Sequence, residues 1–175
     1  DQRLADGLRV ERLAGGEPTV RKDIPDIIRT LRAMGHLPVL ISNGLKLASR
    51  DYVARLKAAG LRTLHLSMNG GLRDDLYQAL DDMACAPRKL SALDVLCEAN
   101  FFVTVGMLLS PGVNDDHVPE FYRYLRDRRR RVREFHLRNS GAMGRHMDGA
   151  RMTMDDLIDR LFEDFTRGVA NFGSA

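Results

Sequence analysis

The chain has 175 residues, of which 44% are hydrophobic and 29% are charged, so it has the length and composition of a single globular domain. It contains no apolar run near the ~20 residues of a membrane-spanning helix and no signal-like amino terminus, which favours a cytoplasmic protein that does not act in a membrane. The formal net charge of +3 is too small to indicate a nucleic-acid partner, and we interpret the arginine-rich run 126–133 as a solvated helix end.

Five segments have the apolar pattern of buried strands, and each is followed by small or polar residues. The predicted strands cover residues 8–13, 37–41, 61–68, 101–109 and 132–137. Between them, apolar residues recur at the i, i+3, i+4 and i+7 positions of amphipathic helices. We expect Asp23 to cap the first of these helices and Ser49 to cap the second.

The alternation of strand and helix predicts an α/β fold, specifically a partial (β/α) barrel of the TIM type with a parallel sheet and right-handed crossovers. We expect residues 1–150 to form this core. Residues 151–175 are expected to form a carboxyl-terminal helix that packs on the core, with a capping-box-like start at Thr153 and Asp156. In such a fold the carboxyl ends of the strands meet at one rim, where α/β sheets place their sites.

The first predicted strand ends in Gly15, Gly16, Glu17 and Pro18, a stretch that opens a strand end to a ligand. Glycine relaxes the steric limits on the backbone, and Pro18 cannot donate a ladder hydrogen bond, so the strand stops there. Glu17 is left with a carboxylate at the rim. For these four residues alone, a simple strand-to-helix turn is an equally good interpretation.

Four further motifs follow the other strands: SNG at 42–44, SMNGG at 67–71, PGVND at 111–115 and LRN at 137–139. In this order and at these separations, the five motifs resemble those of the radical S-adenosylmethionine (radical SAM) enzymes. The resemblance covers about residues 8–144. Each motif alone is weakly specific, but five in register indicate the family.

The resemblance implies that the core binds S-adenosylmethionine at the strand ends. The GGEP carbonyls and Glu17 are then expected to receive the methionyl ammonium, Ser67 and Asn69 the ribose hydroxyls or the carboxylate, and Arg138 the methionyl carboxylate. Asn69 stands where many relatives have Asp, which keeps hydrogen bonding but removes a charge. The implied cofactor-binding residues are Gly15, Gly16, Glu17, Pro18, Ser42, Asn43, Ser67, Asn69 and Arg138. No catalytic residue or metal ligand is assigned.

The family's Cys-x3-Cys-x2-Cys loop, which holds a [4Fe–4S] cluster, does not occur in this sequence. The two cysteines, Cys85 and Cys97, lie too late in the chain, and we interpret them as buried thiols. We expect the first βα unit, with its cluster loop, to be missing here and the cluster to be present in the full-length protein; natural loss of the cluster is the alternative. The chain alone is then expected to be inactive, and its first strand to be an open edge that pairs with a second copy.

The predicted function is therefore that of a radical SAM enzyme core, which supports reductive cleavage of the cofactor and radical chemistry on an unidentified small-molecule or peptide substrate. The alternative is a non-catalytic (β/α) module that binds a nucleotide or a partner, although no P-loop or G-x-G-x-x-G motif supports phosphate binding. His65 is interpreted as a core residue. His136 alternates with Phe135 and Leu137, which allows it to point into the barrel.

Overall fold

A five-stranded parallel sheet forms the centre of the computed structural model, which describes residues 9–110 and 112–139 together with Asp155 and Asp159. The strands lie side by side in the order of the chain, and every neighbouring pair is parallel. The strands are β1 (Val10–Leu13), β2 (Leu37–Ser42), β3 (Thr63–Ser67), β4 (Phe102–Leu109) and β5 (Val132–Asn139). The predicted α/β class and parallel sheet are confirmed.

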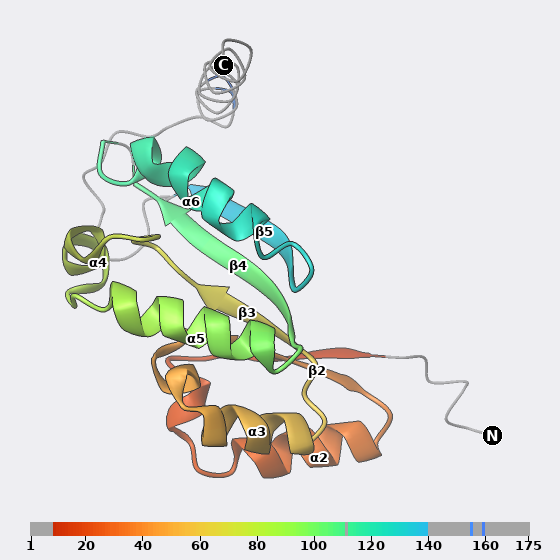
Figure 1. The fold of residues 1–175 in the computed structure, drawn as a ribbon. Coiled ribbons are helices and arrows are strands. Elements are labelled where there is room, and N and C mark those ends of the chain that lie inside the picture. Colours follow the sequence, from red (N-terminus) through yellow and green to blue (C-terminus); the bar gives the residue numbers. More distant parts are fainter. Residues whose placement is uncertain (1–8, 111, 140–154, 156–158, 160–175) are drawn as a thin grey trace.

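The described helices connect successive strands and lie on one side of the sheet (Figure 1). Each strand pairs with the next one in the chain, so right-handed crossovers put every connecting helix on the same face, as in a segment of a barrel. The helices are α2 (Ile24–Ala33), α3 (Arg50–Ala58), α4 (Asp74–Asp81), α5 (Ala86–Glu98) and α6 (Val118–Arg126), with 3-10 turns η1 (Pro18–Val20), η2 (Leu45–Ala48) and η3 (Asp115–His117). We call the opposite face of the sheet its inner face.

The helix-facing side of the sheet forms the hydrophobic core. Alternate strand residues are buried there, as the two-residue period of a strand requires. Those that are at most 1% exposed are Leu40, Leu64, Leu66, Val103, Val105, Met107 and Leu109. Each large side chain buried in this way contributes about 1.5–3 kcal/mol relative to an exposed one. Because a slip of one residue would turn this whole set to the other face, the core fixes the register of the strands.

The inner face carries polar side chains in the same alternation. Thr104 Oγ1 donates a hydrogen bond to Glu134 at 3.2 Å, and the Nε2 of His136 lies 3.0 Å from the same carboxylate. The ring centroid of His136 lies 5.8 Å from that of His65 on β3. His136 therefore points to the inner face, as its alternation predicted. The interior of this partial barrel thus carries charged and hydrogen-bonding groups on β3 to β5.

The helix starts agree with the predicted caps at one position and differ at the other. The side chain of Ser49 accepts a hydrogen bond from the first turn of α3, as predicted. The Asp23 carboxylate makes no cap bond to α2, so that prediction is wrong. It is held instead by the Arg21 guanidinium, with nitrogen–oxygen distances of 3.0 and 2.6 Å. A charge-assisted, bidentate pair of this kind competes successfully with a backbone N–H for the carboxylate.

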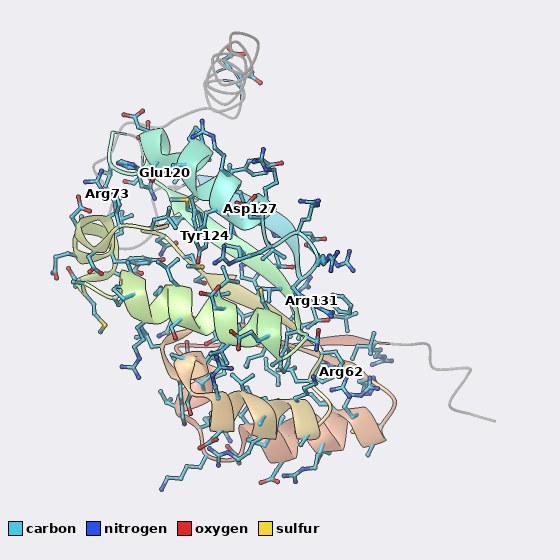
Figure 2. All side chains as sticks on the ribbon, in the orientation of Figure 1. Arg62, Arg73, Glu120, Tyr124, Asp127 and Arg131 are labelled. Atoms are coloured by element: carbon cyan, nitrogen blue, oxygen red, sulfur yellow. The ribbon has the colours of Figure 1, made fainter. Side chains whose placement is uncertain are left out.

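The two ends of the sheet carry different sets of polar groups. Figure 2 shows Arg62 and Arg131 near the amino ends of the strands, and Arg73 and Glu120 near the carboxyl ends. A guanidinium nitrogen of Arg73, which precedes α4, lies 3.0 Å from Nε2 of His117, which precedes α6. This contact joins the starts of two helices beside the rim where the candidate site lies.

The strand β1 is an edge strand among the described strands, because it pairs only with β2. It has four residues, and Val10 is 54% exposed. Pairing of this edge with a second copy stays a prediction. The predicted carboxyl-terminal helix, 151–175, lies outside the described residues apart from Asp155 and Asp159. None of the helices in the described ranges is long and apolar enough to cross a membrane.

Candidate functional site

The carboxyl end of β1 opens into the loop Gly15–Pro18. Gly15 has a φ of +130°, which side chains rarely allow, and both glycines are exposed. Within the described ranges, no backbone hydrogen bond joins either glycine to another residue. A cavity of about 430 Å³ adjoins the loop and is also lined by Leu13, Ile24 and Ile27. With respect to the described residues, the glycine carbonyl groups can therefore accept hydrogen bonds from a ligand.

The carboxylate of Glu17 ties the carboxyl ends of β1 and β2 together. Its Oε1 accepts hydrogen bonds from Thr19 N (3.0 Å), Thr19 Oγ1 (2.6 Å) and Ser42 Oγ (2.9 Å). Its Oε2 accepts from Asn43 N at 2.6 Å. These charge-assisted bonds fix the loop on the sheet. The structure thus places Glu17 at the rim with protein donors on both oxygens, and direct contact with a ligand ammonium stays a prediction.

Ser42 ends β2 and Asn43 follows it, and the side-chain oxygens of both accept hydrogen bonds from the loop after the strand. Ser42 is 2% exposed, and its Oγ donates to Glu17 and accepts from Gly44 N at 3.0 Å. Asn43 Oδ1 accepts from Leu45 N at 3.0 Å. The Ser42 hydroxyl therefore acts within the protein by holding Glu17, whereas Asn43 also borders a cavity.

Two asparagines join the carboxyl ends of β3 and β4. Asn69 accepts from Leu108 N at 3.0 Å through Oδ1, and it donates to Asp81 Oδ1 at 2.9 Å through Nδ2. Asn114 is completely buried, and its Nδ2 donates to the carbonyl oxygens of Asn69 (2.8 Å) and Leu108 (2.7 Å). Its Oδ1 accepts from Ser110 N at 2.8 Å. The side chain of Asn114 thus joins the residues that follow β3 to the end of β4 by hydrogen bonds.

A buried lysine supports the end of β3 from the helix side. Lys89 is 2% exposed, and its Nζ donates to the Ser67 carbonyl at 3.0 Å and pairs with Asp81 Oδ2 at 3.2 Å. The ammonium also lies 4.7 Å from the centroid of the Tyr77 ring. A buried cation is costly unless its donors are satisfied, and here a carboxylate, a carbonyl and an aromatic face satisfy it. Lys89 therefore fixes both Ser67 and Asp81.

Two cavities flank the carboxyl end of β3. The first, of about 140 Å³, is lined by His65, Ser67, Asn69, Gly106, Met107, Leu108 and Arg138. The second, of about 200 Å³, is lined by Asn43, Leu45, Ser67, Asn69, Asp81, Met83, Cys85 and Lys89. Ser67 and Asn69 border both cavities. These two predicted residues therefore lie between the two cavities.

Arg138 reaches from β5 towards β3 on the inner face. One of its terminal nitrogens lies 3.2 Å from Nε2 of His65. Burial, followed by the positive charges of Arg138 and His136, lowers the pKa of His65, although Glu134 opposes this shift. The imidazole is therefore neutral at pH 7, and the guanidinium is the charged group that faces the first cavity.

The nine predicted site residues fall into two groups in the structure. Gly15, Gly16, Glu17, Pro18 and Ser42 form the corner between β1 and β2, whereas Asn43, Ser67, Asn69 and Arg138 line the cavities around β3. The predicted set lacks Asp81, Lys89 and Asn114, which position the second group. One signal for Lys89 was present in the sequence: it lies on the apolar stripe of α5, four and seven residues before the buried Leu93 and Leu96.

A model of the Radical SAM superfamily matches residues 2–125 of this chain. The chain belongs to the radical SAM superfamily. The resemblance inferred from the five motifs is thereby confirmed.

Relatives with this core differ in their reactions. The 7,8-dihydro-6-hydroxymethylpterin dimethyltransferase of Methanocaldococcus jannaschii is 33% identical over an alignment of 181 positions with gaps, which covers 95% of this chain and 35% of that protein. The mitochondrial GTP 3',8-cyclase of Arabidopsis thaliana is 33% identical over 130 residues, which cover 73% of this chain and 33% of that protein. The structure of Streptococcus suis SuiB bound to S-adenosylmethionine has a TM-score of 0.72 at 14% identity, over 95% of this chain and 39% of that one. The chain therefore spans well under half the length of these relatives, and it has the radical SAM barrel fold.

The cysteines of this radical SAM chain do not fit the family's iron–sulfur cluster. The sequence has two cysteines: Cys85 is buried before α5, and Cys97 is half-buried near its end. At 1.5 Å per residue they lie about 18 Å apart along the helix, too far to share one cluster. Burial raises the pKa of both thiols, which disfavours the thiolate that a cluster needs. Within the described ranges, no group of three or more His, Cys, Asp or Glu side chains is placed to hold a metal ion.

Proposed function

We propose that this chain is the S-adenosylmethionine-binding core of a radical SAM enzyme. The observation that carries the proposal is a set of polar groups along one rim that keep hydrogen-bonding capacity for a ligand. It comprises the carbonyl groups of Gly15 and Gly16, the polar atoms of Ser67 and Asn69 beside two cavities, and the guanidinium of Arg138. The methionyl and ribose parts of S-adenosylmethionine carry an ammonium, a carboxylate and two hydroxyls, which these groups match in charge and in hydrogen bonding.

Each part of the cofactor meets a suitable group in this arrangement. The methionyl ammonium can only donate hydrogen bonds, so it binds the open carbonyls of Gly15 and Gly16. The carboxylate takes the fork of the Arg138 guanidinium. Ser67 and Asn69 bind the ribose hydroxyls. Glu17 holds the glycine loop against β2 and adds a negative charge near the ammonium.

The chemistry of the full-length protein is a separate part of the proposal. When bound in enzymes of this family, S-adenosylmethionine supplies a carbon-centred radical. The residues of this chain bind and orient the cofactor, and no step is assigned to them beyond that. Because the relatives include a methyltransferase and a cyclase, the substrate and reaction class differ within the family, and cofactor binding is the property proposed here.

Calorimetry on the full-length protein tests the proposal by comparing S-adenosylmethionine with ATP and AMP. We expect S-adenosylmethionine alone to bind. Nucleotides that bind as tightly as S-adenosylmethionine would instead support the non-catalytic nucleotide-binding module.

A matched pair of variants tests the glycine loop itself. Gly15 and Gly35 both have a positive φ, of +130° and +86°, and both have open space where a Cβ would lie. Alanine at either position is strained, at a cost of about 1–3 kcal/mol. Only Gly15 is at the rim, because Gly35 follows α2 at the opposite end of the sheet. Gly15→Ala should weaken S-adenosylmethionine binding about tenfold, and Gly35→Ala should not change it. Equal affinities in the two variants would refute the assignment of the loop.

A further inference from the structure

The arginine at the rim is held by a histidine two strands away. His65 lies on β3 and Arg138 on β5, and the strand between them, β4, presents Gly106. A Cβ at position 106 would lie 2.2 Å from Nε2 of His65, so any other residue would displace the imidazole. The missing side chain at 106 is what lets His65 meet Arg138, at 3.2 Å, across the intervening strand.

The direction of this hydrogen bond follows from the chemistry of the two groups. A guanidinium carries only N–H donors and stays protonated in proteins, so Arg138 must donate. Nε2 of His65 must therefore carry a lone pair, which places the imidazole proton on Nδ1 in a neutral ring. The groups that face His65 are Arg12 from β1 and Glu134, His136 and Arg138 from β5. Three of these four can carry a positive charge, which favours the neutral ring.

The contact leaves Arg138 oriented but not neutralised. In the described part of the chain, Arg138 forms no ion pair with a carboxylate. It lines the cavity of about 140 Å³ that Ser67 and Asn69 also border. A guanidinium has five N–H donors in a rigid plane, so one bond to His65 fixes that plane and leaves donors for a carboxylate.

We propose that neutral His65 is a positioning residue that holds the Arg138 guanidinium over this cavity, so that Arg138 can bind the carboxylate of S-adenosylmethionine. Gly106 provides the space that this arrangement requires. The identity of the ligand rests on the function proposed above. Protonation of His65 turns Nε2 into a donor that faces another donor, so the guanidinium is released and the carboxylate loses its partner. Binding of S-adenosylmethionine is therefore sensitive to acid through a residue that does not touch the cofactor.

The test measures the affinity of the full-length protein for S-adenosylmethionine by calorimetry between pH 7 and pH 5, where the amino group of the cofactor stays protonated. The parent protein should bind with constant affinity above the ordinary histidine pKa of 6.5 and lose about tenfold at lower pH. His65→Gln places an amide oxygen near the position of Nε2 and cannot titrate; it should keep most of the affinity and lose the dependence on pH. His65→Leu removes the acceptor and should bind about tenfold more weakly at every pH.

His136→Gln is the matched control, because His136 lies on the same face beside His65 but pairs with Glu134. This variant should keep the acid sensitivity of the parent, with the midpoint moved to higher pH because a positive charge beside His65 is removed. A profile that follows His136 rather than His65, or a His65→Gln protein as sensitive to acid as the parent, would overturn the proposal.

A second measurement does not depend on the cofactor. Nitrogen NMR of histidine-labelled full-length protein should show His65 neutral at pH 7, with its proton on Nδ1. Arg138→Leu should raise the pKa of His65, because it removes a neighbouring positive charge. A proton on Nε2, or no change in Arg138→Leu, would refute the pairing itself. If the pairing is found but no variant binds S-adenosylmethionine at any pH, the proposed function is refuted, together with the ligand named here.

Discussion

The two halves of the rim use the same kinds of residue in different ways. At the ends of β1 and β2, the Glu17 carboxylate accepts four hydrogen bonds from the protein, and Ser42 is 2% exposed. At the ends of β3 to β5, Asn69 and Arg138 border a cavity of about 140 Å³ and are fixed by partners that leave some of their donors unused. In the first half, the polar side chains are hydrogen-bonded within the protein. In the second half, polar side chains border a cavity and keep donors for a ligand.

This difference shows what each half presents to a ligand. In the first half, the side chains of Glu17 and Ser42 form hydrogen bonds that fix the glycine loop. The groups left for a ligand are therefore the backbone carbonyls of Gly15 and Gly16. In the second half the buried groups Lys89 and Asn114 do the holding, which leaves side chains for recognition. A positively charged group therefore suits the first half, and a negatively charged or hydroxyl group suits the second.

The largest change in the free energy of unfolding is expected at Asn114, the completely buried residue of the second half. Asn114→Ala removes three hydrogen bonds and leaves two carbonyls and the N–H of Ser110 with a lost partner. Since each unsatisfied buried group costs about 1–3 kcal/mol, we expect a loss of about 3–5 kcal/mol in the free energy of unfolding, measured with urea. Val113→Ala, at a neighbouring residue that is 38% exposed, should change it by less than about 0.5 kcal/mol. A loss for Asn114→Ala as small as that of the control would show that the strand ends do not depend on this side chain.

The second prediction separates charge from packing at the buried lysine. Lys89→Met keeps most of the volume but leaves Asp81 without its cation. Breaking a fully buried pair costs about 3–5 kcal/mol, and because the Asp81 side chain is 24% exposed we expect a smaller loss of about 2–3 kcal/mol. The double variant Lys89→Met, Asp81→Asn removes the unpaired charge and should recover part of the stability. Thermal or urea unfolding that ranks the double variant below the single one would attribute the loss to packing instead.

The residues in these predictions show what could be read from the sequence and what could not. Strand and helix periods gave the five strands, and the small residues after them gave the rim, because these are local patterns. The pairing of Glu17 with Ser42 spans 25 residues and depends on how β1 and β2 align, which no local pattern contains. The meeting of His65 with Arg138 depends in the same way on a glycine in the intervening strand.

The third prediction tests whether the Glu17 carboxylate serves mainly to fix the glycine loop, as its hydrogen bonds to the protein indicate. Glu17→Gln places an amide N–H₂ among the donors of Thr19, Ser42 and Asn43. We expect a loss of about 2 kcal/mol in the free energy of unfolding, because a charge-assisted bond is lost and a donor faces a donor. Affinity for S-adenosylmethionine should fall in the same variant, because the glycine loop is no longer fixed. Asn69→Ala, which removes a neutral hydrogen bond to the cofactor, should cost less affinity, about 0.5–1.5 kcal/mol. Weaker binding with unchanged stability in Glu17→Gln would show instead that the carboxylate contacts the ligand directly.

The smallest effect is expected from the titration of His65 in the second half. Burial, Arg138 and His136 lower its pKa in the folded protein below the ordinary value of 6.5. Between that lowered pKa and 6.5, the unfolded chain binds more protons at this residue than the folded protein does, so acid favours unfolding. The contribution is complete above pH 6.5 and is lost as the pH falls through this window. The free energy of unfolding of the parent should therefore fall relative to that of His65→Gln below pH 6.5, whereas the difference between the two should be constant above it. A difference that stays constant down to pH 5 would show that His65 titrates alike in both states and that the inner face does not hold it neutral.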